Sequence, residues 1–352
     1  MADEKRLMKG NEAMGEAAVR AGCDAYFGYP ITPQNELTAY MAKHMIDQKR
    51  VFIQAESEVS AINMVYGAAA TGARTMTSSS SPGISLKQEG ISYACGADVP
   101  IVVINVARSG PGLGGISPAQ GDYYQSTRGG GHGDYYHIVL APKSVQEAAD
   151  LTFEAFDLAD AWRMPAMVLA DGMIGQMMEG VVLPKAKDPA TRIAKPWASG
   201  RRPEGRPVNH VDSTHLVPEE FEQANIARYK RYDEMKKVLP RWEEQFVDDA
   251  DLILTAYGTS ARVCLGAMQM ARKLGFKVGL LRPITLWPFP EKRFGELAGK
   301  KFLTVEMSMG QMVDDVRLHT LGKSEVSFYG RCGGMIPTEE DVLAEIKRIL
   351  KK

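Results

Sequence analysis

The chain has 352 residues, of which 45% are hydrophobic and 24% are charged, and its formal net charge is -1. This length predicts about two domains with ample core, and the composition is ordinary for a globular protein. The small net charge gives no electrostatic case for nucleic-acid binding, and no apolar run approaches the roughly 20 residues needed to span a membrane. The N-terminus is charged at once and lacks the apolar segment of a signal peptide, so we expect a cytoplasmic protein.

Residues that could hold a metal or a cluster are few and scattered. The cysteines are Cys23, Cys95, Cys264 and Cys332, and they form no Cys-x-x-Cys pair. Iron–sulfur clusters require several thiolates at close spacing, and the six histidines show no metal-ligand spacing. We therefore expect no metal centre within this chain.

The first 190 residues alternate between strand-like and helix-like segments. Short apolar runs typical of buried strands lie at 26–28, 51–53, 74–77, 101–107, 138–140 and 167–170. Helices are expected at 10–21, from 33 to about 44, from 58 onward, and at 144–161, where Ser144 is an N-cap and Glu147 completes a capping box. Repeated strand–helix units predict a doubly wound parallel sheet covered on both faces.

The character of the chain changes after residue 190. Pro, Arg and Gly dominate from about 190 to 218 without periodicity, which indicates a linker or long surface loop, and Pro218 opens a polar helix that we expect to run to about 246. Alternation resumes with strands near 251–258, 277–281, 302–306 and 326–329, and with helices starting near 260, 290, 310 and 338. We predict a first α/β domain at 1–190, a linker with a polar helix at 191–247 and a smaller α/β domain at 248–352.

Four loops follow neighbouring strands of the first region and stand out as ligand-binding candidates. In open parallel sheets, ligands bind beyond the carboxyl ends of the strands. The loops are residues 28–33, 54–58, 78–83 and 108–116. Their convergence at one edge of the sheet is stronger evidence for a site than any single motif.

Glu58 is the most unusual residue in these loops. It opens a helix that continues through Ala61, Ile62 and Val65, so the helix is expected to be buried. An exposed acid at a first helical turn is ordinary, because it complements the helix dipole. A carboxyl group in small, apolar surroundings instead tends to share or keep a proton at neutral pH, which suits proton transfer.

The loop Gly28–Pro33 (Gly-Tyr-Pro-Ile-Thr-Pro) and the segment Gln54–Ala61 (Gln-Ala-Glu-Ser-Glu-Val-Ser-Ala) resemble a known family. It is the alpha, pyrimidine-binding subunit of the 2-oxoacid:ferredoxin oxidoreductases, which use thiamine diphosphate. The resemblance covers nearly the whole chain and is weakest between about 195 and 247. It is closest to the branched-chain (2-oxoisovalerate) type, as judged from the stretches 110–114, 129–135 and 170–172.

The resemblance implies a fold and a cofactor site. The fold is a thiamine-diphosphate-type parallel-sheet domain followed by a domain like the C-terminal one of transketolase. Glu58 would be the catalytic carboxyl that contacts the pyrimidine ring nitrogen, and Tyr29, Pro30 and Ile31 would bind the cofactor with it. Glu56 is the rival carboxylate, but the family's spacing along the helix fits Glu58 and not Glu56.

The same resemblance implies substrate contacts. Arg108 would hold the 2-oxoacid carboxylate, since Arg offers a planar, two-pronged donor, and Thr32 would hydrogen-bond the substrate. The alternatives are a structural Arg108 that caps strand-end carbonyls and a Thr32 hydroxyl that stabilises its own loop. Whether Arg128 or His132 reaches the site is left open.

Half of the expected machinery is missing from the sequence. Thiamine diphosphate enzymes hold the diphosphate and Mg²⁺ with a Gly-Asp-Gly run followed about two dozen residues later by Asn. Ala170–Gly172 is not that run, and the next asparagine is Asn209. We expect a beta subunit that binds diphosphate and Mg²⁺, and gamma and cysteine-rich, ferredoxin-like delta subunits or domains that carry [4Fe-4S] clusters.

The expected activity is that of an enzyme subunit, silent without these partners, in the oxidative decarboxylation of a 2-oxoacid. Coenzyme A would accept the acyl group and ferredoxin the electrons, giving acyl-CoA and carbon dioxide. Alternatives are a 2-oxoglutarate or pyruvate oxidoreductase subunit, a non-catalytic scaffold, and a nucleotide-binding module that uses the glycines at 110–115. The last lacks the helix opening and acidic ribose partner of a dinucleotide fingerprint.

Overall fold

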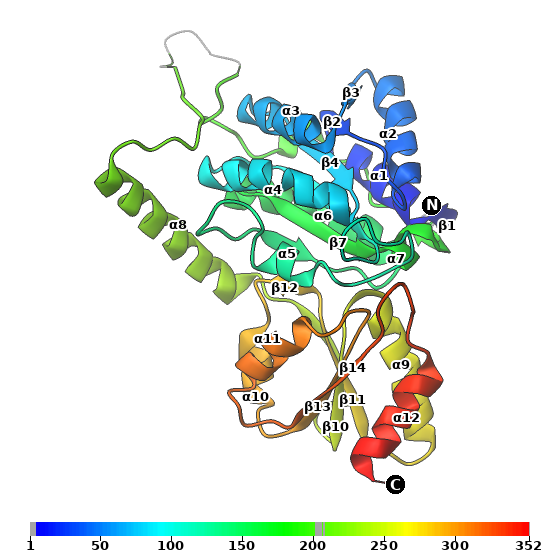
Figure 1. Ribbon diagram of the computed structural model, residues 1–352. Helices are drawn as coiled ribbons and strands as arrows, with labels where there is room; N and C mark the ends of the chain where they lie inside the picture. The colour runs from blue at the N-terminus through cyan, green and yellow to red at the C-terminus, as the bar shows by residue number, and fades with distance from the viewer. Residues whose placement is uncertain (1–4, 201–205, 207, 352) are drawn as a thin grey trace.

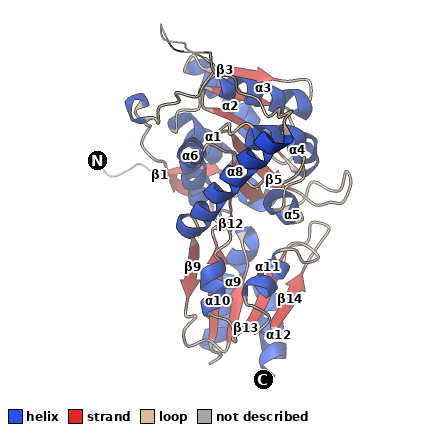
Figure 2. Ribbon diagram, turned by 90° about the vertical axis from the view of Figure 1, so that its left-hand side faces the viewer, coloured by secondary structure: helices blue, strands red, loops and turns tan. Residues whose placement is uncertain are grey.

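The computed structural model describes residues 5–200, 206 and 208–351. These residues form two α/β domains stacked end to end, with the N-terminus in the upper domain and the C-terminus at the foot of the lower one (Figure 1). The long helix α8 (Pro218–Val238) lies across the outside of the upper domain and leads to the lower one (Figure 2).

The described residues of the first domain build a seven-stranded sheet. Its strands are parallel except for β12 at one edge, which runs antiparallel to β6. In their order across the sheet they are β12 (Thr285–Trp287), β6 (Ile138–Leu140), β7 (Ala166–Asp171), β5 (Val102–Ala107), β4 (Thr75–Ser79), β2 (Ala25–Gly28) and β3 (Val51–Gln54). The central strand β5 is buried along its whole length, as its β-branched sequence Val-Val-Ile-Asn-Val-Ala favours.

Helices cover both faces of this sheet. One face packs α1 (Gly10–Arg20), α2 (Asn35–Asp47) and α6 (Val145–Trp162), and the other packs α3 (Glu58–Ala70) and α4 (Ser81–Gly96). Short elements complete the domain: α5 (Tyr123–Thr127), α7 (Gly172–Gln176), the 3-10 turn Pro189–Thr191 and an antiparallel pair of β1 (Lys5–Lys9) and β8 (Met178–Val182). The layered arrangement brings the carboxyl ends of β2, β3, β4 and β5 to one edge.

The second domain is a smaller version of the same design. Its described residues form a five-stranded sheet in the order β14 (Val326–Gly330), β13 (Lys301–Glu306), β10 (Leu252–Thr255), β11 (Val278–Pro283) and β9 (Trp242–Gln245). One face carries α9 (Gly258–Lys273) and α12 (Glu339–Leu350), and the other carries α10 (Glu291–Glu296) and α11 (Met312–His319). The parallel α/β class expected from the sequence is therefore present in both domains.

Two local expectations were wrong. The polar helix ends at Val238 rather than near 246, because Leu239 precedes Pro240 and the residue before a proline disfavours helical backbone; the strand β9 follows instead. The Ser144 hydroxyl accepts the N–H of Glu147, but Glu147 does not complete a capping box. Its carboxylate accepts the N–H of Lys143 at 3.0 Å and binds Arg282 at 2.7 Å.

Two strands cross the limits of the predicted segments 1–190, 191–247 and 248–352. The strand β12 leaves the second region and joins the edge of the first sheet, and β9 leaves the linker segment and joins the second sheet. Trp287 of β12 stacks on Tyr136 of the first domain, with ring centroids 5.0 Å apart and an interplanar angle of 8°. As a result, one hydrophobic core runs continuously from α1 to α11.

A buried carboxylate fastens the two domains at the carboxyl end of β7. Asp171 accepts the backbone N–H of Thr259 at 2.8 Å and its hydroxyl at 2.7 Å, both from the start of α9. It also accepts the N–H groups of Met173 and Ile174 at 3.1 Å. Gln120 adds a second link by donating to the carbonyl of Tyr257 at 2.7 Å. The relative placement of the domains is thus set by buried hydrogen bonds.

We predict that Asp171→Ala lowers the free energy of unfolding of the chain by about 2–4 kcal/mol, because buried N–H groups lose their acceptor. Chemical denaturation monitored by circular dichroism measures this loss. The control is Asp47→Ala, at the exposed end of α2, which should change stability by less than about 0.5 kcal/mol. Equal effects of the two substitutions would contradict the proposed fastening.

Candidate functional site

Glu58 is the first residue of α3, and its side chain is buried, with 7% exposure. The helix begins there because the hydroxyl of the N-cap residue Ser57 accepts the N–H of Ser60 at 3.2 Å. In the part of the chain that the structure describes, no hydrogen bond reaches the Glu58 carboxylate. A buried carboxylate with unused acceptors is costly for a fold, and this is the usual mark of a group kept for another molecule.

Gly83 makes the room for this carboxylate. A Cβ atom on Gly83 would lie 2.7 Å from Oε1 of Glu58 and 2.1 Å from the hydroxyl oxygen of Ser79. Both distances are too short for a real contact, so the glutamate lies directly over the bare Cα of the first turn of α4. The Ser79 hydroxyl is itself buried without a partner among the described residues.

The rival carboxylate has a different environment. Glu56 is exposed and accepts a hydrogen bond from the hydroxyl of Ser60, which lowers the pKa of the Glu56 carboxyl. An exposed, hydrogen-bonded carboxylate is a poor proton carrier compared with a buried one.

The loop at 28–33 lies beside this helix start. Tyr29 and Pro30 are exposed and Ile31 is half-buried. The Thr32 hydroxyl accepts from the side-chain amide of Asn35 at 3.2 Å, so it is engaged within its own loop. Asn11 and Gln176 fix the far end of the loop by donating to the carbonyl of residue 33, at 2.8 and 2.7 Å.

Arg108, at the end of β5, ties three of the predicted loops together. Its guanidinium donates from Nη1 to the carbonyl of Thr32 and from Nη2 to the carbonyl of Leu113, each at 3.0 Å. Its backbone N–H donates to the Ser81 hydroxyl at 3.0 Å. Arg108 therefore organises the loops, which is the kind of structural role considered as the alternative to substrate binding. Its buried Nε–H has no partner in the described residues.

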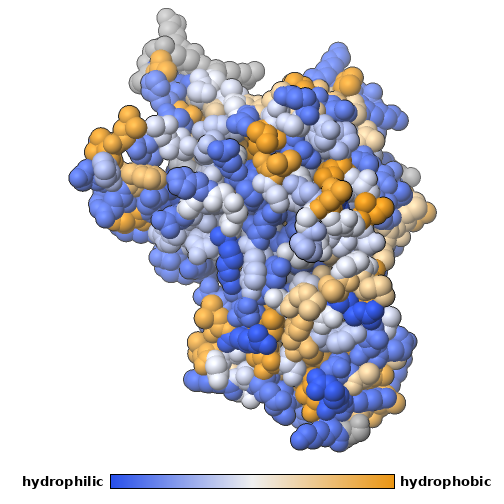
Figure 3. Space-filling model, viewed as in Figure 1, coloured by the Kyte–Doolittle hydropathy of each residue, from blue (hydrophilic) through white to orange (hydrophobic). Residues whose placement is uncertain are grey.

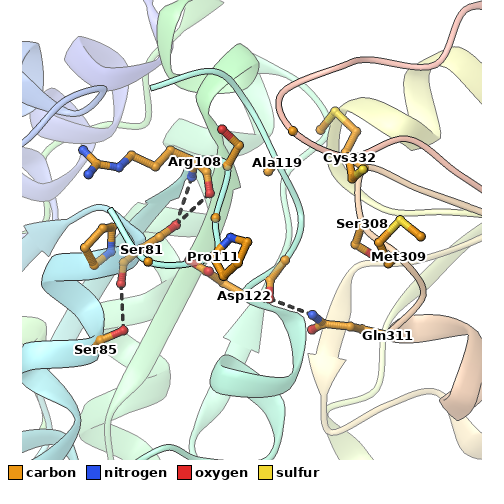
Figure 4. A pocket seen from close by; sticks show the side chains of 17 residues that line it. Ser81, Ser85, Arg108, Pro111, Ala119, Asp122, Ser308, Met309, Gln311 and Cys332 are labelled. Atoms are coloured by element: carbon orange, nitrogen blue, oxygen red, sulfur yellow. Dashed lines mark hydrogen bonds between the residues drawn. The ribbon is translucent and has the colours of Figure 1, made fainter. Parts of the chain in front are cut away.

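A cavity of about 340 Å³ opens between the two domains next to Arg108. The first domain contributes Ser81, Ser85 and the loop at 108–112, and the second contributes residues 307–309, Gln311 and 332–333 (Figure 4). Gln311 closes one side by donating to the carbonyl of Gly121 at 2.8 Å. Glu58 and Thr32 do not line this cavity.

Two carboxylates that shape the cavity were not found from the sequence. Asp122 borders it and accepts from Asn105 at 2.8 Å; burial raises the pKa of the Asp122 carboxyl. Glu306 accepts the N–H groups of residues 311–313 at 3.0–3.2 Å, and burial raises its pKa as well. The glycine at position 310 is the sequence signal that this tight loop offers, because its φ of 103° lies in the left-handed region that favours glycine.

Arg128 and His132, left open by the sequence, do not line the interdomain cavity. Arg128 pairs with the buried Asp315 at 2.6 Å, in the second domain. His132 borders a different cavity, of about 220 Å³, between α4 and α8. Neither residue is placed to receive a group bound beside Arg108.

The glycine-rich loop at 110–115 does not support nucleotide binding. It folds back on itself, with the N–H of Gly115 donating to the carbonyl of Ser109 at 2.8 Å. The next described helix is α5, which begins only at Tyr123. A phosphate-binding loop instead opens directly into a helix.

Across residues 5–200, 206 and 208–351, no cluster of three or more His, Cys, Asp or Glu side chains is arranged to bind a metal ion. None of the helices in these residues combines the length and the apolar character required to cross a bilayer.

Comparison with known proteins assigns the chain to a family. Residues 16–244 match the family model described as pyruvate flavodoxin/ferredoxin oxidoreductase, thiamine diphosphate-binding. Residues 250–342 match pyruvate:ferredoxin oxidoreductase core domain II. The chain belongs to this family. The resemblance seen in the sequence is thereby confirmed, and the chain is a subunit of a 2-oxoacid:ferredoxin oxidoreductase.

Curated relatives span the chain almost completely. A ketoisovalerate oxidoreductase subunit VorB from Methanothermobacter thermautotrophicus is 49% identical over 98% of this chain and 97% of its own length. The 2-oxoglutarate synthase subunit KorA of Methanothermobacter marburgensis is 33% identical over 97% and 98%. The similarity to the branched-chain type is therefore the stronger of the two.

Solved structures share the fold. The 2-oxoglutarate:ferredoxin oxidoreductase from Magnetococcus marinus superposes with a TM-score of 0.85 at 25% identity, covering 98% of this chain and 65% of that one. A split-gene transketolase superposes over 98% of both chains with a TM-score of 0.59 at 12% identity. The predicted transketolase-like fold class is confirmed.

We predict that Gly83→Ala folds but slows 2-oxoacid oxidation by the assembled complex about 10²-fold, the scale of a 1 Å misplacement of a reacting group. The new methyl group displaces the Glu58 carboxylate while Ser79 rotates away. Steady-state rates of ferredoxin reduction measure the loss. The matched control is Gly295→Ala in α10, whose Cβ would meet nothing closer than 3.7 Å. Near-normal rates for Gly83→Ala would contradict the close packing of Glu58.

Proposed function

We propose that this chain is the pyrimidine-binding subunit of a complex that oxidatively decarboxylates a branched-chain 2-oxoacid with coenzyme A. The products are an acyl-CoA, carbon dioxide and reduced ferredoxin. The observation that carries the proposal is the buried Glu58 carboxylate, which has unused acceptors at the carboxyl edge of the sheet. The relatives named ketoisovalerate oxidoreductase support the choice of substrate class.

The residues around Glu58 fit the pyrimidine half of thiamine diphosphate. The bare Gly83 accommodates the Glu58 carboxylate, and we propose that Tyr29, Pro30 and Ile31, in the loop after β2, contact the cofactor beside it. When bound, thiamine diphosphate supplies the electron sink that decarboxylation of a 2-oxoacid requires. Glu58 holds and moves a proton at the pyrimidine ring nitrogen, and its burial keeps water from competing for that position.

The diphosphate half of the site belongs to a partner. Asp171, the acid of the Ala-Asp-Gly run, is saturated by hydrogen bonds at the domain junction and has no acceptor directed outward for a metal. We propose a beta subunit that binds diphosphate and Mg²⁺, together with gamma and delta subunits whose [4Fe-4S] clusters pass electrons to ferredoxin. Exposed apolar residues lie on α3 and α4, where a partner would dock: Val59, Met64 and Leu86 (Figure 3).

Arg108 and Thr32 are proposed to hold the substrate. Two guanidinium donors of Arg108 bind loop carbonyls, and its buried Nε–H has no acceptor among the described residues. The guanidinium is directed away from the interdomain cavity (Figure 4), so a carboxylate that it held would lie on the other side of the loop at 108–112. The structural role and the binding role are therefore compatible in one side chain. A non-catalytic scaffold would have no need to keep Glu58 buried without partners.

Glu58→Gln is predicted to leave the fold intact and to slow decarboxylation by on the order of 10²–10⁴, because an amide cannot exchange a proton with the pyrimidine. Carbon dioxide release by the assembled complex is the measurement. Glu56→Gln is the matched control and should be milder, since Glu56 is exposed. Normal turnover of Glu58→Gln would contradict the assignment of Glu58 as the acid–base group.

We expect Arg108→Lys to raise KM for the 2-oxoacid more than KM for coenzyme A, because lysine lacks the two-pronged donor. Thr32→Val should act in the same direction through loss of a hydrogen bond of about 0.5–1.5 kcal/mol. Initial-rate kinetics with each substrate varied separately distinguish the two constants. If both variants keep the normal KM for the 2-oxoacid, Arg108 retains only its loop-organising role.

The substrate class is tested by anaerobic co-purification with the partners followed by acyl-CoA assays over several 2-oxoacids. We predict that branched-chain 2-oxoacids give a higher kcat/KM than 2-oxoglutarate. A distal carboxylate needs a second basic group, and Arg128 is committed to Asp315. A preference for 2-oxoglutarate that is abolished by Arg128→Ala would reverse the substrate choice and leave the family unchanged.

A further inference from the structure

Lys87 is a buried lysine at the contact between α3 and α4. It lies in α4, and its side chain has no exposed surface. Its Nζ donates to the backbone carbonyl of Glu58 at 3.3 Å. Neighbouring positions on this face of α4 are Ile84 and Gly90, both buried, and a Cβ on Gly90 would lie 2.6 Å from the side chain of Ile62. The two helices are therefore in close contact, with an ammonium group enclosed between them.

This position is unfavourable for a positive charge on two counts. Burial removes the hydration of the ammonium group, and the first turn of α3 carries the positive end of a helix dipole. In the described residues, Lys87 has no ion pair, and a neutral carbonyl is the one acceptor found for its three donors. Burial lowers the pKa of Lys87 to about 8, while the charge of Glu58 opposes that change. An unbranched apolar side chain would fill the space at less cost.

The other charged and titratable groups near α4 are committed elsewhere. Glu56 binds Ser60, and Glu89 accepts from Tyr93 on the exposed side of α4. On the elements packed against α4, Arg108 donates to loop carbonyls and Asp122 accepts from Asn105. Tyr135 donates to Gln88, and Arg228 donates to the carbonyl of Gly96 in the last turn of α4. His132 borders the separate cavity beside α8. Glu58 is thus the acid whose charge acts on Lys87.

We propose that Lys87 is a positioning residue for Glu58. Its ammonium anchors the first turn of α3 through the Glu58 carbonyl, and so fixes the position of the carboxylate that the same residue carries. This inference rests on the proposed role of Glu58 in proton transfer. It adds a residue that acts through Glu58, and it accounts for an ammonium group buried between α3 and α4.

A double-mutant cycle in the assembled complex tests this coupling. Lys87→Met should lower kcat by about 10- to 100-fold and leave both KM values near normal. This loss is smaller than the reduction on the order of 10²–10⁴ that is expected when the acid–base group itself is removed. The pH–rate profile of Lys87→Met should differ from that of the wild type, because a charged group that interacts with Glu58 has been removed. In the Glu58→Gln background the same substitution should cause no further loss, since residues that act through one another are not additive. Lys43→Met removes an exposed lysine of α2 and is the matched control.

A second readout needs neither cofactor nor turnover. A lysine whose pKa is lower in the folded chain than in the unfolded one makes the folded state bind fewer protons, so stability rises with pH between the two values. The melting temperature of the wild-type chain minus that of Lys87→Met should therefore increase between about pH 8 and pH 10. In the Glu58→Gln chain this gain should begin at lower pH, because the neutral amide no longer favours the ammonium form.

Each outcome decides the proposal. A fully active Lys87→Met complex with an unchanged pH–rate profile would overturn it, as would a loss of rate that is additive with Glu58→Gln. Failure of Lys87→Met to fold would assign the lysine a purely structural role and would also overturn it. If Glu58→Gln is itself fully active, the proposed function of Glu58 fails, whereas an inactive Glu58→Gln with a normal Lys87→Met removes only the inference about Lys87.

Discussion

The structure depends on the hydrogen bonds that Asp171 makes at the carboxyl end of β7. One carboxylate accepts from α7 in its own domain and from the start of α9 in the next domain, so both helix starts are fixed to the same strand end. Because this edge of the sheet also carries the loops after β2, β3, β4 and β5, fixing the second domain here places its 307–311 segment opposite Arg108. The interdomain cavity follows from that constraint.

Three buried carboxylates illustrate how the environment assigns a role to the same chemical group. Asp171 and Glu306 are saturated by N–H and hydroxyl donors, which offset the cost of burying a charge and make these groups structural. Glu58 is buried to a similar degree but receives no hydrogen bond to its carboxylate in the described residues. The fold therefore leaves the acceptors of the Glu58 carboxylate unused, which is the observation behind the proposed role of this residue.

Under the proposed function, the chain supplies one side of a shared cofactor site. The features it would contribute are the buried Glu58 carboxylate, Arg108 and an apolar surface over α3 and α4, while the acid of its Ala-Asp-Gly run is engaged at the domain junction. The same proposal accounts for hydrophobic residues such as Leu86 that are exposed on the helices next to Glu58, where a partner chain would cover them. Lys87 lies on the face of α4 that contacts Glu58, and it does not line the cavity.

The sequence by itself determined the alternation of strands and helices and the buried helix start at Glu58, because hydrophobic periodicity and N-cap residues are local signals. The tertiary structure decided what local signals cannot carry. The antiparallel addition of β12 to the first sheet, the contact between Lys87 and Glu58, and the commitment of Arg128 to Asp315 join residues tens to hundreds of positions apart. Arg108 shows the same division. Its position after a buried strand suggested a ligand contact, but only the folded structure shows that two of its donors bind main-chain carbonyls. Those contacts exist only because folding brings Thr32 and Leu113 together around the guanidinium.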